Sequence, residues 1–86
     1  MKYLEIDCEA REEITTMRRL IRDCKATVVS ETTIEGDSFS HLIWLTGSDE
    51  ALHEVVKFFE PGATLEEAMV FIDSDTRRYR EEHSDS

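Results

Sequence analysis

The side chains that could take part in covalent chemistry are few in this chain. It contains two cysteines, Cys8 and Cys24, and three histidines, His41, His53 and His83. A thiol becomes a nucleophile when a neighbouring base takes its proton, and Cys8 and His41 could form such a pair if both lie near strand ends. The histidines lack the spacing of a helical metal motif, and the cysteines lack the C-x-x-C spacing. We therefore expect free thiols, no metal and no cofactor.

A second set of residues favours binding rather than bond making. Strand alternation predicts one sheet face that carries Tyr3, Glu5, Glu31, Glu35, Leu42 and Trp44. Tyr and Trp bury large rigid areas at interfaces, and carboxylates select a basic partner. We predict that these six residues bind a partner. In the alternative, a C-terminal helix or a second copy of the chain covers Trp44 as part of a core.

Basic residues form a second candidate surface on the first expected helix. The surface consists of Arg11, Arg18, Arg19 and Arg22. Arg18 and Arg22 are four residues apart, so two like charges lie side by side on a helix and favour a negative neighbour. That neighbour is either an anion or acidic partner, or a glutamate of the following helix, where Glu50, Glu54 and Glu60 are available.

The elements that position these residues follow from the hydrophobic period. Alternation over residues 2–6 predicts a strand, and helical periodicity predicts a helix over about 9–25 with Asp7 as its N-cap. Residues 27–35 and 38–46 are rich in β-formers and predict a hairpin that turns at Gly36-Asp37, with the second strand in the centre of the sheet. A helix follows that is capped by Ser48 and ends at Pro61-Gly62, with Leu52, Val55, Val56 and Phe59 at helical spacing.

A third helix is predicted after Pro61-Gly62. Thr64 and Glu67 have the spacing of a capping box, and an apolar stripe follows, made of Leu65, Ala68, Met69, Ile72, Thr76 and Tyr79. Val70 and Phe71 lie off this stripe. They leave open the alternative that residues 68–72 form a fourth strand.

The order of these elements predicts an α+β fold. The order β-α-β-β-α resembles the ferredoxin-like split βαβ arrangement, with a C-terminal third helix or, in the alternative, a fourth strand at residues 68–72. Residues 1–80 are expected to form a single domain, and residues 81–86 a frayed acidic tail. The resemblance rests on element order and does not by itself imply a function.

Composition restricts the possible partners. The chain has 86 residues with 10 Lys and Arg against 20 Asp and Glu, a net charge of −10. Such a charge repels nucleic acid and anionic membranes. The longest apolar runs, residues 42–45 and 68–72, are far shorter than the roughly 20 residues that span a bilayer. We expect a cytoplasmic protein without a signal peptide, with no direct nucleic-acid contact and no membrane contact.

The leading hypothesis is a non-enzymatic interaction protein that binds and inhibits the basic, nucleic-acid-binding surface of a larger protein. Small phage inhibitors of host defence, such as anti-CRISPR proteins, are similar in size and charge. One alternative is a regulatory homodimer that binds a small molecule and resembles ACT domains. Another is a small ferredoxin-like dimeric enzyme that holds its substrate against Trp44 and His41.

Overall fold

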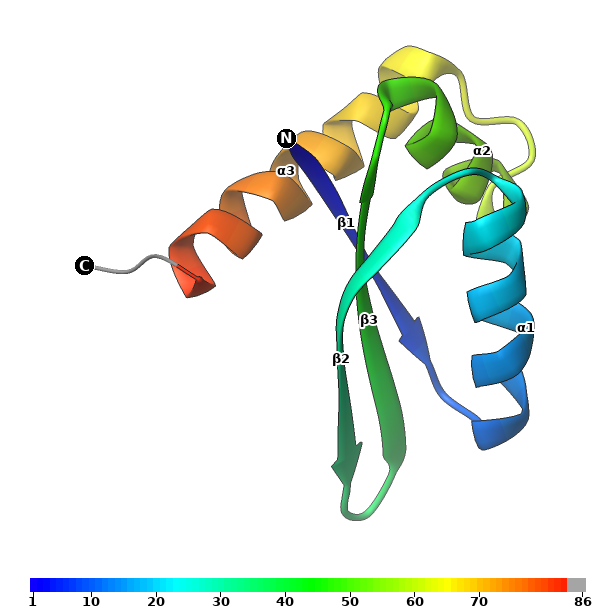
Figure 1. The fold of residues 1–86 in the computed structure, drawn as a ribbon, viewed down its shortest axis with the longest axis vertical. Coiled ribbons are helices and arrows are strands. Elements are labelled where there is room, and N and C mark those ends of the chain that lie inside the picture. Colours follow the sequence, from blue (N-terminus) through cyan, green and yellow to red (C-terminus); the bar gives the residue numbers. More distant parts are fainter. Residues whose placement is uncertain (84–86) are drawn as a thin grey trace.

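Three antiparallel strands and three helices form an α+β fold in the computed structural model, which describes residues 1–83 (Figure 1). In chain order the elements are β1 (Lys2–Cys8), α1 (Arg11–Asp23), β2 (Thr27–Glu35), β3 (Phe39–Gly47), α2 (Asp49–Phe59) and α3 (Leu65–Glu82). α3 extends two residues into the predicted acidic tail, and residues 84–86 of that tail lie outside the described part of the chain.

β3 is the central strand, as its apolar side chains on both faces predict. The strand order is β1-β3-β2, and β3 pairs antiparallel with both neighbours. Ile43 and Leu45 of β3 are fully buried with Leu4 and Ile6 of β1. This sheet face carries the hydrophobic core.

α1 and α2 supply the helical side of that core. Met17 and Ile21 of α1 pack in one cluster with Leu52 and Val55 of α2. The predicted N-cap of α1 is wrong, because Asp7 belongs to β1. The helix begins after Ala10 and has no side-chain cap.

Sequence signals identified the starts of the other two helices correctly. The Ser48 hydroxyl accepts a bond of 3.1 Å from the Ala51 amide and caps α2. At the start of α3, the Thr64 hydroxyl accepts from the Glu67 amide, and the Glu67 carboxylate accepts from the Thr64 amide. Residues 68–72 are helical, so the described chain forms a sheet of three strands rather than four. None of the described helices combines the length and the apolar character that crossing a membrane requires.

A β-bulge in β2 changes which side chains face the core. Val28 pairs with Leu45 and Ser30 pairs with Trp44, so Val29 is an extra residue without a partner on β3. Side chains alternate along a strand, and one extra residue therefore transfers the rest of the strand to the other face. Beyond the bulge, Glu31 pairs with Ile43, which places Glu31 on the helix-covered face.

α3 closes the outer edge of β1. The Thr76 hydroxyl accepts a bond of 2.8 Å from the Tyr3 amide and donates one of 3.2 Å to the Tyr3 carbonyl. The Asp75 carboxylate accepts from the Glu5 amide at 3.0 Å. An open strand edge invites pairing with another chain, and these side chains satisfy its backbone groups instead.

Candidate interaction surfaces

Trp44 lies in an aromatic cluster that α3 covers. Tyr79 stacks on Tyr3 with ring centroids 3.8 Å apart, and it meets Trp44 edge-on at 5.1 Å. His83 stacks on the other side of Tyr79 at 3.9 Å. Only 6% of Trp44 is exposed. The sequence left open whether Trp44 is exposed on a binding face or covered. In the structure a C-terminal helix covers it.

Arg78 completes the cover over this aromatic cluster of Tyr3, Trp44, Tyr79 and His83. Its guanidinium carbon lies 5.0 Å from the Trp44 ring centroid, within the range of a cation–π contact. The same guanidinium donates to Glu5 at 3.0 Å and to Asp75 at 3.2 Å. Glu5 is thus engaged within the chain. Leu42 is half-buried and lies two residues before Trp44 in β3, nearer to the hairpin turn.

Glu31 and Glu35 do not share the face of Trp44, which corrects the placement expected from simple alternation. Because of the bulge, both lie on the side of α1. Arg18 binds Glu31 through two nitrogens, the closer at 2.8 Å, and Arg11 forms an ion pair with Glu35. The arginines of α1 are therefore partly neutralised by β2, and not by the glutamates of α2. Arg19 and Arg22 form no ion pair with residues 1–83.

Glu31 also organises a small polar network around the buried His41. The His41 Nε2 lies 2.6 Å from the Glu31 carboxylate, and its Nδ1 lies 2.7 Å from the Thr33 hydroxyl. A carboxylate only accepts, so Nε2 donates to Glu31, and the Thr33 hydroxyl, which can donate or accept, pairs with Nδ1. The Arg18 guanidinium lowers the pKa of the Glu31 carboxyl, and the bond from His41 acts in the same direction. The network satisfies His41 within the chain.

Cys8 pairs across the sheet with His41 but has the surroundings of a core thiol. Cys8 is fully buried, and burial raises its pKa, with the nearby Glu13 and Asp7 carboxylates adding to the rise. A reactive cysteine needs the opposite shift. Both ring nitrogens of His41 bind other groups. The geometry therefore does not support the Cys8–His41 pair as a nucleophile and its base.

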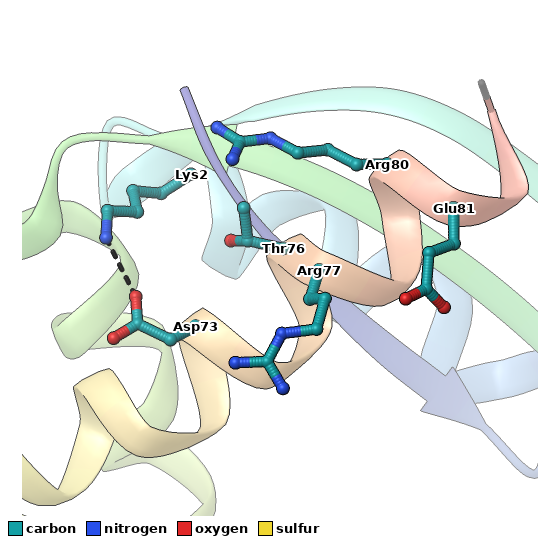
Figure 2. Close-up of a pocket in the computed structure, with 6 residues that line it drawn as sticks. All are labelled: Lys2, Asp73, Thr76, Arg77, Arg80 and Glu81. Atoms are coloured by element: carbon teal, nitrogen blue, oxygen red, sulfur yellow. Dashed lines mark hydrogen bonds and ion pairs between the residues drawn. The ribbon is translucent and has the colours of Figure 1, made fainter. Parts of the chain in front are cut away.

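A polar groove lies between the start of β1 and α3 (Figure 2). Its lining residues are Lys2, Asp73, Thr76, Arg77, Arg80 and Glu81. Lys2 extends beside the helix to form an ion pair of 2.7 Å with Asp73, and Arg80 extends over β1 and donates to the Met1 carbonyl at 3.1 Å. Two of the three basic residues of this groove therefore bind across the contact between β1 and α3.

A group of exposed apolar side chains lies where α2 and α3 meet. Two hollows occur here and share Phe71 and Glu60. Val56 and Phe59 line the first with Leu4, and Ala63 and Val70 line the second. Phe59 is 53% exposed, Phe71 50% and Val70 69%. We call this surface the α2–α3 groove, formed by Leu4, Val56, Phe59, Ala63, Val70 and Phe71.

Every charged residue that lines the α2–α3 groove is a carboxylate. Glu5, Glu60 and Asp75 border the first hollow, and Glu60 and Glu67 border the second. A contiguous apolar patch with a polar rim is typical of a site for another macromolecule. The sequence indicated this exposed surface, because Val70 and Phe71 are the two apolar residues that lie off the apolar stripe of α3.

No group of histidine, cysteine, aspartate and glutamate side chains in residues 1–83 has the arrangement of a metal site. The comparison of this chain with protein-family models, with curated proteins and with solved structures gave no match.

Proposed function

We propose that the protein is a non-enzymatic interaction protein that binds a basic surface of a larger protein through the α2–α3 groove. The observation that carries this proposal is the exposed apolar surface around Phe71, bordered only by carboxylates among its charged residues. An apolar centre provides affinity through burial, while charges at the rim select the partner and speed association. A basic partner fits both features.

The charge of the whole chain supports the same partner. Intrachain ion pairs engage Lys2, Arg11, Arg18, Lys57 and Arg78, half of the ten basic residues. The acidic excess remains on the surface and gives the net charge of −10. A field of this sign attracts basic protein surfaces and repels phosphates.

A basic surface that binds nucleic acid is a natural target for such a protein. Carboxylates that occupy it compete with phosphates for the same Lys and Arg side chains. The proposed consequence is inhibition of the partner, as small anti-CRISPR-like proteins inhibit theirs. We also propose that the fold is a ferredoxin-like split βαβ arrangement in which α3 takes the place of a fourth strand along β1.

The test compares partner capture by matched variants. The Phe59→Ser/Phe71→Ser variant removes two walls of the α2–α3 groove, while Ile34→Ser removes a side chain of similar exposure, 52%, on β2. We expect wild type and Ile34→Ser to retain the same basic protein from the cells in which this chain occurs, in a salt-sensitive manner, and the double variant to lose it. The purified partner should then bind nucleic acid more weakly when wild type is added.

The outcome that contradicts the proposal is equally specific. Retention of the same proteins by wild type and by a folded double variant would exclude the α2–α3 groove as the binding site. Unchanged nucleic-acid binding by the captured partner would exclude inhibition by competition. Circular dichroism and thermal unfolding verify that each variant is folded.

A further inference from the structure

We infer that the partner segment that enters the α2–α3 groove is a basic amphipathic helix that inserts one apolar side chain into each of the two hollows beside Phe71. This inference rests on the proposed function and specifies the chemistry of the partner. It follows from the size of the hollows, from the backbone of their walls and from the charges of their rim.

The hollows fit separate side chains better than a compact small molecule. Their volumes are about 220 and 250 Å³. Small-molecule sites in proteins usually have about 300–1,000 Å³ and enclose most of the ligand. Phe71 and Glu60 line both hollows, so the two hollows are neighbours. The occupant therefore presents two neighbouring apolar anchors, as a peptide segment does.

The walls favour a helical segment over an extended one. Most of the groove is built from α2 and α3, whose backbone groups are hydrogen-bonded within each helix. An extended peptide gains affinity by adding main-chain bonds to a free strand edge, and the outer edge of β1 is bonded to Thr76 and Asp75 at Tyr3 and Glu5. A helix satisfies its own backbone and needs only side-chain contacts. Its residues at i and i+3 or i+4 lie about 5–6 Å apart on one face, which suits two adjacent hollows.

The charges at the rim of the α2–α3 groove disfavour a second copy of this chain as its occupant. Two copies that meet through this groove would oppose Glu60 and Glu67 to the same carboxylates of the other copy. Arg78 partly neutralises Glu5 and Asp75, but the charged residues that line the hollows include no base. Lys and Arg on the flanks of a partner helix would face these acids, in the pattern of a basic amphipathic segment.

The experiment uses a defined peptide as the probe. A labelled Leu–Lys peptide of about 18 residues, with Leu at i, i+3, i+4 and i+7, has one apolar face and basic flanks. A second peptide has the same composition with Leu and Lys alternating, and a third has Glu in place of Lys. Binding of each is measured by fluorescence anisotropy and located by amide chemical-shift changes.

We expect the helical Lys peptide to bind wild type most tightly, with the largest shifts at residues of the α2–α3 groove. Phe71→Ser should weaken its binding about tenfold or more, whereas Ile34→Ser should leave it unchanged. Glu60→Gln/Glu67→Gln should weaken it more than Glu9→Gln/Glu66→Gln, which removes the same charge from two residues that line neither hollow. Gln at position 67 keeps the capping geometry, so the first variant remains a fair match.

Each contrary result overturns a defined part of the argument. Equal groove binding by the alternating peptide would overturn the helical occupant and leave a basic partner in place. If no basic peptide depended on Phe71, both this inference and the proposed function would fail. Tighter binding of the Glu peptide, or self-association of wild type that Phe71→Ser abolishes, would replace the basic partner with an acidic segment or a second copy.

Discussion

The two halves of α3 differ in whether the aromatic residue beside or within them is buried. The C-terminal half covers Trp44 with Tyr79 and Arg78, and leaves it 6% exposed. The N-terminal half buries Ala68 and Ile72 but leaves Val70 and Phe71 in solvent. The comparison teaches that an aromatic residue in a small acidic chain indicates a binding surface only when no element of the same chain reaches it.

The largest expected effect tests whether the covered half belongs to the core. Trp44→Ala should lower the free energy of unfolding by about 3–5 kcal/mol, because it removes a large buried ring and leaves a cavity under α3. Phe71→Ala, its counterpart in the exposed half, should change it by less than about 1 kcal/mol. Urea unfolding measures both values. If the two variants lowered the free energy of unfolding by similar amounts, Trp44 would not belong to the core more than Phe71 does.

The next effect concerns how α3 is fastened to β1. Thr76→Val keeps the shape of the side chain but removes the partner of the Tyr3 amide and carbonyl. Because these backbone groups then lack a hydrogen-bond partner, the free energy of unfolding should fall by about 1–3 kcal/mol. Hydrogen exchange of the Tyr3 amide should also become faster. Slow exchange at this amide in the variant would show that the covered half does not depend on this contact.

A smaller effect isolates the charged cover over Trp44. Arg78→Met keeps much of the apolar stem but loses the cation–π contact and the ion pairs with Glu5 and Asp75. The expected cost is about 0.5–1 kcal/mol, since the Arg78 side chain is 42% exposed and water weakens such contacts. A double-mutant cycle with Trp44→Leu measures the part that belongs to the ring. Complete additivity in that cycle would mean that Arg78 and the Trp44 ring do not stabilise each other.

The smallest effect is a response to acid at the exposed end of α3. Backbone and side-chain hydrogen bonds from Thr64 lower the pKa of Glu67 below its ordinary value of 4.5. A lowered folded-state pKa means that the capping contribution is fully present above the unfolded value and is lost as the pH falls through the folded value. Below pH 4.5 the Thr64 and Glu67 amides should therefore lose protection, measured as the exchange rate relative to an unstructured chain at the same pH, while the Tyr3 amide stays protected. Glu67→Gln keeps a capping group that does not titrate, so an acid response that persists in this variant would assign the effect to another residue.

Local signals in the sequence predicted most of the elements. Ser48 and the Thr64–Glu67 capping box fixed the starts of two helices, and the apolar composition of β3 identified the central strand. The helix over residues 68–72 followed from the stripe of Ala68 and Ile72. These features depend on residues within one or two turns of each other, so they can be recognised without the rest of the chain.

The composition of the predicted binding face could not be obtained in the same way. Alternation placed Glu31 and Glu35 beside Trp44, but one unpaired residue at Val29 sends them to α1, where arginines bind them. Nothing in the residue types around Val29 marks the bulge. That Glu31 and Glu35 bind a partner remains a prediction, but they would do so from the sheet face opposite to Trp44.

The amino-acid sequence by itself determined the acidic charge, the periods of strands and helices, and the caps of α2 and α3, because each is a property of single residues or of close neighbours. The tertiary structure alone decided that Trp44 is covered and that Phe71 is exposed. Both outcomes depend on the path of α3 along β1, which is set by contacts such as Tyr3 with Thr76, 73 residues apart. A helical stripe shows which side of α3 must be buried, but only packing against β1 and α2 shows how much of the remaining surface is left for a partner.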